Sequence, residues 1–315
     1  MTKRCLHCYQ PLAKDETDFH EKCSLRFFGT HHPPKLALSK KAMDKMANEI
    51  VIRSVAVTGV QPKLSLTIEK IPGDLKNSRI TIVGALGGNF ILKPQSPSFE
   101  SLPENEDLTM HLAQIVGIKT AEHSLLRTTS GELVYLTKRF DRNKKEKLHC
   151  EDLCQLTETL TENKYSSSME KVGKAVKKYA TFPLLEAVSL YEITLFSFLT
   201  GNSDMHLKNF SILKEEKGNN TLAPCYDLLN TKLVNPKDLE ESALTINGRK
   251  NKIKRSDFDA FGKNIGLNAK QMEAVHEKFR AKQKELLAFV KISFLSNGQS
   301  EEYTAMLKER GKMLR

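Results

Sequence analysis

Apolar and polar residues alternate from position 64 to position 69, a pattern that predicts a half-buried β-strand. Short apolar runs predict three more strands, at residues 80–83, 89–93 and 134–137. The segments between the first runs contain proline and glycine, residues that are typical of tight turns. We therefore expect a small antiparallel sheet in the first half of the chain.

Later in the chain the apolar residues recur at helical spacing. A capping box with proline in the first turn begins a predicted helix at residue 101, and Gly117 ends it. The longest apolar run, residues 184–199, predicts a second helix that ends at Gly201. Two glutamates interrupt this run, which favours a buried helix over a membrane span. At least two amphipathic helices are predicted after residue 256.

The composition is that of a globular protein, since 39% of the 315 residues are hydrophobic and 28% are charged. The first residues lack the apolar core of a signal peptide, so we expect a soluble, cytoplasmic protein that does not bind membranes. The formal net charge of +11 suits nucleic acid, nucleotide phosphates or an acidic protein partner. A solvated basic surface explains the charge equally well.

The N-terminus holds four soft metal ligands in two pairs with short spacing: Cys5 and Cys8, then His20 and Cys23. Each pair can place two ligands on one turn, which is the arrangement of a tetrahedral structural zinc site. A knuckle with reduced thiols and no metal has the same spacing, and the sequence leaves both open. The remaining three cysteines are expected to be ordinary buried thiols.

The most specific chemical pattern lies in residues 201–210 and in the aspartate at position 227. Asp204, Asn209 and Asp227 follow the order in which a protein kinase presents its catalytic base and its two magnesium ligands. Lys208 adds positive charge beside them. His206 either stabilises the loop or faces the site. Polar residues that only cap turns would give a similar pattern.

A lysine and a glutamate in the first half of the chain complete this interpretation. Lys93 ends an apolar strand, where it either reaches solvent or contacts ATP phosphates. Glu106, in the following helix, is the candidate partner for the lysine–glutamate ion pair of kinases. Glu104 is explained by the helix dipole alone.

Six segments taken together resemble the HipA family of bacterial serine/threonine kinase toxins. They lie at residues 59–63, 88–94, 104–106, 139–142, 201–210 and 222–227. The resemblance implies an α+β, two-lobed protein-kinase-like fold, with a β-rich N-lobe at 36–138 and a mainly helical C-lobe at 139–315. The Cys/His knuckle at 1–35 is not part of the pattern of the best-known members.

The resemblance also implies roles for individual residues. Asp204 would be the catalytic base, assisted by Lys208, and Asn209 and Asp227 would bind Mg²⁺. ATP would be contacted by residues from several motifs: Thr58, Gly59, Val60, Gln61, Lys63, Lys93, Glu106, His206, Asn209 and Asp227. The family autophosphorylates the loop before the Gly-x-Gln motif, where Thr58 or Ser54 offers a hydroxyl.

The short segment before residue 58 makes the chain similar to HipT, the kinase of three-component HipBST systems. The implied partners are a protein substrate, a HipB-like helix-turn-helix antitoxin and a HipS-like small protein. DNA would be contacted only through the antitoxin. Known targets of the family are aminoacyl-tRNA synthetases. Two other functions compete with this one: a small-molecule or lipid phosphotransferase, and a nucleic-acid-binding module that uses the knuckle and the basic surface.

Overall fold

The computed structural model describes residues 3–36, 63–71, 73–83, 87–143 and 146–314. The chain divides into two compact units. Unit 1 consists of Met1–Asp107 and Ala121–Arg139, and unit 2 of Leu108–Thr120 and Phe140–Arg315. Helix α3 (Leu102–Ile115) contributes residues to both. The division into three parts at residues 35 and 138 stays a prediction.

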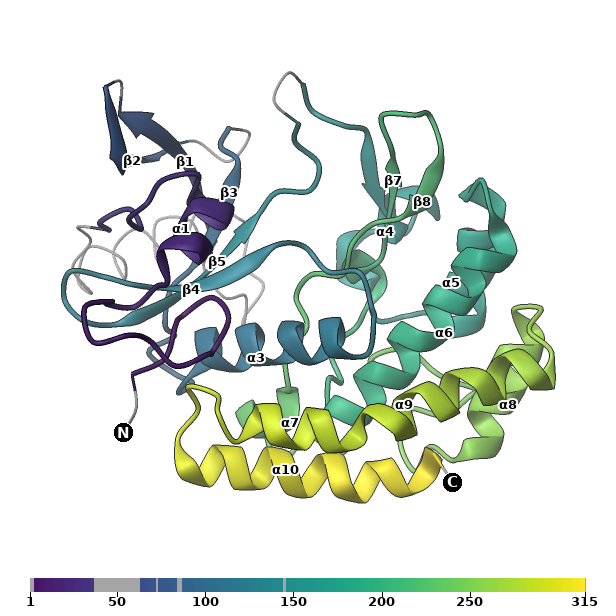
Figure 1. Cartoon of the computed structure of the whole chain (residues 1–315). Helices are drawn as coiled ribbons and strands as arrows, with labels where there is room; N and C mark the ends of the chain where they lie inside the picture. The colour runs from purple at the N-terminus through teal and green to yellow at the C-terminus, as the bar shows by residue number, and fades with distance from the viewer. Residues whose placement is uncertain (1–2, 37–62, 72, 84–86, 144–145, 315) are drawn as a thin grey trace. The chain divides into compact units, whose positions relative to one another are not determined.

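Unit 1 is built on a five-stranded sheet with the strand order β2-β1-β3-β5-β4 (Figure 1). Its strands are β1 (Leu64–Ile71), β2 (Asp74–Ile82), β3 (Phe90–Lys93), β4 (His123–Arg127) and β5 (Leu133–Lys138). All neighbours pair antiparallel. Alternate residues of β1 are buried, because successive side chains of a strand point to opposite faces.

The N-terminal segment packs on this sheet through helix α1 (Glu21–Phe28). The ring of Phe27 meets that of Phe90 on β3 at a centroid distance of 5.7 Å. The carbonyl of Leu6 accepts a hydrogen bond of 3.3 Å from the backbone N–H of Leu125 on β4. The Cys/His knuckle therefore shares the hydrophobic core of unit 1.

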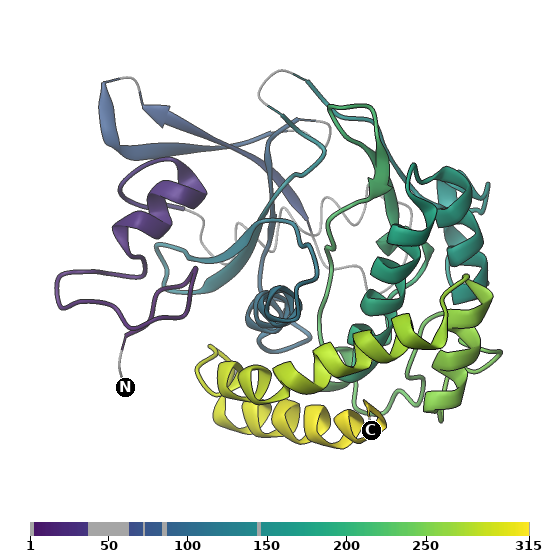
Figure 2. The ribbon, with the colours of Figure 1, turned by 45° about the vertical axis from the view of Figure 1, so that its right-hand side comes forward.

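Unit 2 is mainly helical, with a small antiparallel sheet in the order β6-β7-β8. The sheet consists of β6 (Cys150–Asp152), β7 (Ser211–Lys214) and β8 (Asn220–Leu222). The helices are α4 (Leu153–Leu156), α5 (Met169–Tyr179), α6 (Pro183–Thr200), α7 (Thr231–Val234), α8 (Arg255–Asn264), α9 (Ala269–Val290) and α10 (Asn297–Gly311). Three 3₁₀ turns complete the list: η1 (Thr161–Asn163), η2 (Leu207–Asn209) and η3 (Lys312–Leu314). Helices α9 and α10 lie side by side (Figures 1 and 2).

Helix α6 is the central element of unit 2. It is long and apolar enough to cross a membrane, yet 67% of that stretch is buried inside the protein. Twelve of its residues are buried, among them one charged residue, Glu186, and three aromatic residues, Tyr191, Phe196 and Phe198. The helix is thus a core element, as its interrupting glutamates predicted.

The predicted strands and long helices are present, with extended or shifted ends. Strand β2 begins at Asp74, earlier than the apolar run at 80–83 indicated, because its first half is polar and is held by pairing with β1. Strands β4 and β6 and helices α1, α4 and α5 were not predicted. Helix α10 ends at Gly311 and is followed by η3.

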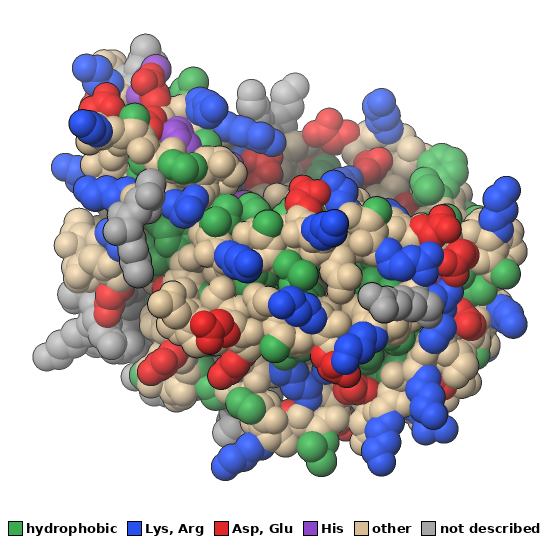
Figure 3. All heavy atoms as spheres, turned by 60° about the horizontal axis from the view of Figure 1, so that its bottom comes forward, with side chains coloured by type: hydrophobic (Ala, Val, Ile, Leu, Met, Phe, Trp, Pro, Cys, Tyr) green, Lys and Arg blue, Asp and Glu red, His purple; other side chains and the backbone are tan. Residues whose placement is uncertain are grey.

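Basic and acidic side chains are interspersed on the face that Figure 3 shows, where lysines and arginines lie among aspartates and glutamates. Several exposed ion pairs are present in the described part of the chain, for example between Lys282 and Glu285 at 2.7 Å. On this face the positive charge is distributed as a solvated surface.

Candidate active site

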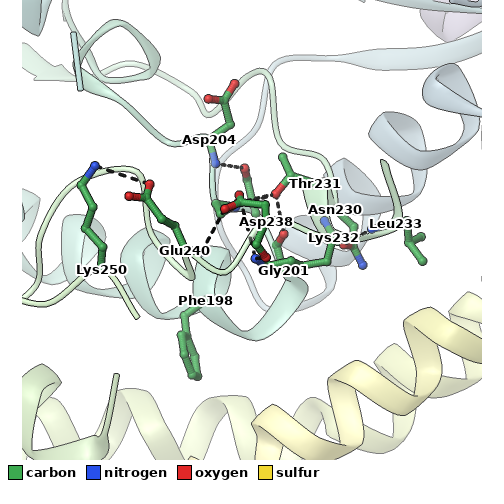
Figure 4. Close-up of polar contacts among 12 residues, drawn as sticks. Phe198, Gly201, Asp204, Asn230, Thr231, Lys232, Leu233, Asp238, Glu240 and Lys250 are labelled. Atoms are coloured by element: carbon green, nitrogen blue, oxygen red, sulfur yellow. Dashed lines mark hydrogen bonds and ion pairs between the residues drawn. The ribbon is translucent and has the colours of Figure 1, made fainter. Parts of the chain in front are cut away.

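The loop that follows α6 is fixed by short hydrogen bonds to the start of α7. The hydroxyl of Thr231 donates to the Gly201 carbonyl (2.9 Å) and accepts from the Ser203 backbone N–H (2.8 Å). The Ser203 hydroxyl donates to Asp238 at 3.0 Å. Figure 4 shows the Asp204 carboxylate pointing away from this network. The loop therefore holds its backbone rigidly and presents one carboxylate.

Asp204 is exposed, whereas its neighbours Ser203 and Met205 are buried. Its carboxylate accepts a hydrogen bond of 2.7 Å from the hydroxyl of Tyr165. Burial of the phenol raises the pKa of Tyr165 well above its usual value, and the contact with Asp204 raises it further. Tyr165 therefore stays protonated and donates the hydrogen bond. The Asp204 carboxylate is therefore accessible to a hydroxyl group that donates a hydrogen bond.

The 3₁₀ turn η2 orders the residues that follow. The Asn209 side-chain oxygen accepts from the His206 backbone N–H at 3.2 Å, and the Asn209 N–H donates to the His206 carbonyl at 2.9 Å. Burial lowers the pKa of His206 to about 4, although the negative charges of Asp204 and Asp227 oppose the shift. His206 is therefore neutral at pH 7, and its ring lies edge-on to Tyr165 at 5.0 Å.

Lys208 extends from η2 to a carboxylate that the sequence did not single out. Its ammonium forms an ion pair of 2.6 Å with Asp152, and the two side chains are 36% and 15% exposed. Asp152 also caps α4 in a capping box with Gln155. The Asp-x-x-Gln spacing was a readable signal for that cap, but nothing in the sequence related it to Lys208.

Asp227 follows the β7–β8 hairpin. It has a positive φ of 56°, which is uncommon for a residue with a side chain and is maintained only by its surroundings. The preceding Tyr226 provides such support, since its hydroxyl donates to the Lys208 carbonyl at 2.8 Å. The hairpin thus returns the chain to η2, and both Asp204 and Asp227 act on the pKa of His206.

In unit 1, the predicted lysine–glutamate ion pair is present. The Lys93 ammonium lies 2.5 Å from the Glu106 carboxylate, and the side chains are 4% and 2% exposed. Tyr135, the neighbour of Lys93 across β3 and β5, places its ring 5.4 Å from the ammonium. A buried ion pair of this kind fixes the end of β3 against the first turns of α3.

Some of the other candidate residues from the sequence lie in the described part of the chain, and some lie outside it. Lys63 is exposed at the start of β1. Ser54, Thr58, Gly59, Val60 and Gln61 lie outside the described residues. The knuckle residues Cys5, Cys8, His20 and Cys23 do converge, with their ligand atoms within 4.8 Å of one another.

Tyr165 and Asp152 are the two site residues that sequence reasoning missed. Tyr165 comes from the segment after η1, and only the folding of unit 2 places it on Asp204. The donor set of unit 2 consists of carboxylate and amide oxygens from Asp204, Asn209 and Asp227. These are hard ligands of the kind that Mg²⁺ prefers, so the residues present fit this ion.

Comparison with known proteins agrees with these observations. The family profile described as "HipA-like C-terminal domain" matches residues 55–286. A Haemophilus influenzae protein named "Putative kinase" is 27% identical over 265 residues, which cover 76% of this chain and 75% of that protein. The "Serine/threonine-protein kinase toxin HipA" of Shewanella oneidensis is 25% identical over 68% of this chain and 52% of its own length.

Solved structures show the same fold. The chain matches HipA of Shewanella oneidensis MR-1, solved with HipB and operator DNA, with a TM-score of 0.68 at 22% identity over 84% of this chain and 70% of that one. It matches the Helicobacter pylori proinflammatory kinase CtkA with a TM-score of 0.54 at 18% identity over 74% of this chain and 90% of that one. The predicted α+β, kinase-like fold is therefore confirmed. The chain belongs to the family that shares the HipA-like C-terminal domain.

Proposed function

We propose that the protein is an ATP-dependent serine/threonine kinase that acts as the toxin of a bacterial toxin–antitoxin system. The observation that carries the proposal is the hydrogen bond of 2.7 Å between the Tyr165 hydroxyl and Asp204. This bond supports the proposal because it shows that the Asp204 carboxylate is accessible to a hydroxyl donor. Family membership and the name of the Shewanella oneidensis relative support the same reaction.

Asp204 is the proposed catalytic base, because it is the exposed carboxylate of an otherwise buried loop. It orients the attacking hydroxyl and accepts its proton. Asn209 and Asp227 are the proposed ligands of Mg²⁺, which when bound neutralises charge on the transferring phosphate. Lys93, held by Glu106, is the proposed contact to ATP phosphates. Lys208 adds positive charge that Asp152 balances in part.

The proposed regulation and partners follow the family. Thr58 or Ser54 is the proposed autophosphorylation site, and a phosphate there would add nearly two negative charges to the loop. A HipB-like antitoxin is the proposed partner, as in the complex of the Shewanella protein with HipB. We propose a HipS-like protein as a second, small partner. The proposed substrate is an aminoacyl-tRNA synthetase or another translation component.

Two experiments separate this function from its rivals. Wild-type protein and Asp204→Asn are incubated with labelled ATP and a bacterial lysate. We expect wild-type-dependent label on protein, reduced by roughly 10²-fold or more in Asp204→Asn. Asp15→Asn, which changes an exposed aspartate, is the matched control and should label like the wild type. Label in small molecules or lipids alone would instead identify a small-molecule phosphotransferase.

Expression in cells tests the toxin role. Wild type should arrest growth, and Asp204→Asn should not. Equal arrest by both would reject kinase-dependent toxicity. Tight, salt-sensitive DNA binding by the isolated chain would favour the nucleic-acid-binding function.

A further inference from the structure

The four candidate ligands near the N-terminus converge in unit 1, with their ligand atoms within 4.8 Å of one another. Cys5 is fully buried, Cys23 is 7% exposed, and Cys8 and His20 are half-buried. The Cys8 sulfur lies 3.3 Å and the Cys23 sulfur 3.7 Å from Nδ1 of His20. In tetrahedral zinc sites with Zn–S near 2.3 Å and Zn–N near 2.0 Å, sulfur and nitrogen ligands are about 3.6 Å apart. The observed separations agree with that geometry.

The second nitrogen of His20 supports the same assignment. Its Nε2 donates to the Pro11 carbonyl at 3.0 Å, and its Nδ1 faces the sulfurs of Cys8 and Cys23. Histidine ligands of metals are typically oriented in this way, by donating their other N–H to a carbonyl or carboxylate. Three thiols and an imidazole are soft ligands that select zinc over Mg²⁺ or Ca²⁺.

The knuckle is also tied to α3. Tyr9, directly after the second cysteine, has a positive φ of 62°, which is strained for an aromatic residue. Its fully buried hydroxyl donates to Asp107 on α3 at 2.8 Å. The other Asp107 oxygen accepts from His123 on β4 at 2.7 Å. Asp107 follows Glu106, the partner of Lys93.

We propose that Cys5, Cys8, His20 and Cys23 bind one structural zinc ion, and that the metal-loaded knuckle holds Tyr9 on Asp107 and so positions the first turns of α3. Tyr9 is a positioning residue in this scheme. The ion closes the 5–8 turn and thereby maintains the backbone conformation that directs Tyr9 into the core.

Metal content tests the first half of the proposal. Protein purified without chelators or metal-affinity steps should contain about one zinc ion per chain by elemental mass spectrometry. Cys8→Ser changes one of the two half-buried knuckle ligands and should lose that zinc. Cys150→Ser, a matched change at a half-buried cysteine outside the knuckle, should keep it.

A spectroscopic measurement covers the case in which Cys8→Ser fails to fold. Wild-type protein exchanged with Co²⁺ should show the thiolate charge-transfer and tetrahedral ligand-field bands of a three-sulfur site. A wild type that contains no zinc as purified and shows no such bands after addition of Co²⁺ would overturn the site. Equal zinc loss in Cys8→Ser and Cys150→Ser would overturn it as well.

Hydrogen exchange tests the link to α3. Removal of zinc from the wild type should speed amide exchange in residues 104–107. Tyr9→Phe should retain zinc, show faster exchange in this segment from the start, and respond less to zinc removal. Unchanged exchange on zinc removal from the wild type would refute the positioning role while leaving the metal site to its own test.

Discussion

At the scale of single residues, the site depends on which polar groups are exposed and which are buried. Asp204 remains in contact with solvent, while His206 and Asn209 beside it are buried and organise the backbone. Burial makes His206 neutral, so the positive charge near Asp204 comes from lysines. The contact of Tyr165 with Asp204 is the residue-level feature with the clearest functional consequence.

Replacement of Tyr165 by Phe should raise the proposed kinase activity. The substrate hydroxyl would no longer compete with a phenol whose hydrogen bond is worth about 0.5–1.5 kcal/mol, so kcat/KM should rise roughly 2–10-fold. Initial rates of substrate phosphorylation measure this. Tyr179→Phe, which removes a hydroxyl bonded to the Leu156 carbonyl, is the matched control. A loss of activity in Tyr165→Phe would mean that Tyr165 supports Asp204 and does not compete with substrate.

Glu104 is expected to make stability depend on pH. Burial, together with the charge of Asp107, raises its pKa from an ordinary value of 4.5 to about 7. Between these pH values the folded protein retains a proton that the unfolded chain has lost. The free energy of unfolding should therefore fall as pH rises from 4.5 to 7, by at most about 3 kcal/mol.

The comparison of Glu104→Gln with wild type isolates this effect from the titration of other groups. Glutamine does not ionise, so the variant should gain stability relative to wild type between pH 5 and pH 8 in urea titrations. Glu100→Gln, at an exposed position just before α3, should show a difference from wild type that does not change with pH. A constant difference for Glu104→Gln as well would show that Glu104 titrates normally.

At the scale of elements, the ends of helices and strands place the functional side chains. Gly201 ends α6 with a φ of 75° and starts the loop that carries Asp204. The ion pair of Lys93 and Glu106 connects the end of β3 with α3. Replacement of Gly201 or of Glu106 should therefore destabilise the protein, for a different physical reason in each case.

Gly201→Ala should destabilise unit 2 more than Gly218→Ala, the same change at another glycine with positive φ. Gly201 and Gly218 both have positive φ, 75° and 86°, so alanine costs about 1–2 kcal/mol at each. At Gly201 the new Cβ would also lie 2.8 Å from the Asn230 side-chain oxygen and would collide with Met306, whereas at Gly218 it meets nothing within 4 Å. The collision should cost about 1–3 kcal/mol more.

Chemical denaturation measures the stability of the Gly201→Ala and Gly218→Ala variants, and initial rates measure their kinase activity. We expect Gly201→Ala to lose activity as well, since the Asn230 side chain caps α7 and the Asp204 loop is bonded to the same turn. Equal effects of the two substitutions would show that the loop adapts to the added methyl group.

Glu106→Ala should cost about 3–5 kcal/mol, because it leaves the buried Lys93 ammonium without this carboxylate. Glu122→Ala is the control, since its ion pair with Lys138 also measures 2.5 Å but its side chain is 59% exposed. Such exposed pairs contribute about 0–1 kcal/mol. Native-state hydrogen exchange of β3 and β5 reports the difference. Similar values for the two variants would argue that solvent reaches the Lys93 pair.

At the scale of the whole molecule, the chain forms two compact units, and the proposed ligand must stabilise the folded state. Mg-ATP at about 100 times its Kd should add about 2.7 kcal/mol. For a protein of this size that corresponds to a rise in Tm of roughly 3–5 °C.

Thermal unfolding with ATP, with and without added Mg²⁺, checks the metal requirement. The rise should be smaller without Mg²⁺ and smaller in Asp227→Asn, while Asp15→Asn should respond like wild type. Chelators should be avoided, since they would also remove the zinc ion that we propose for the knuckle. The proposed magnesium ligands would be contradicted if Tm rose equally in wild type with Mg²⁺, wild type without Mg²⁺, Asp227→Asn and Asp15→Asn.

Much of the fold could be predicted because it follows from local rules. Alternation predicted β1, and the capping box with Gly117 predicted α3 within two residues of its ends. Strand β4 was missed because its residues are almost all buried and therefore do not alternate. Helix α1 was missed because its polar residues and its cysteine, Cys23, are also typical of a loop. Its aromatic face is stabilised by packing on the sheet.

The sequence by itself determined the identities and order of the chemical groups: Asp204, Asn209 and Asp227, the Lys93–Glu106 pair, and four soft ligands at the N-terminus. Short spacing and turn chemistry are local, so they can be read along the chain. Only the tertiary structure decided which distant groups meet them. Tyr165 on Asp204, Asp152 on Lys208 and Tyr9 on Asp107 join residues that are 39, 56 and 98 positions apart. Such contacts depend on the packing of whole elements, which no local pattern specifies.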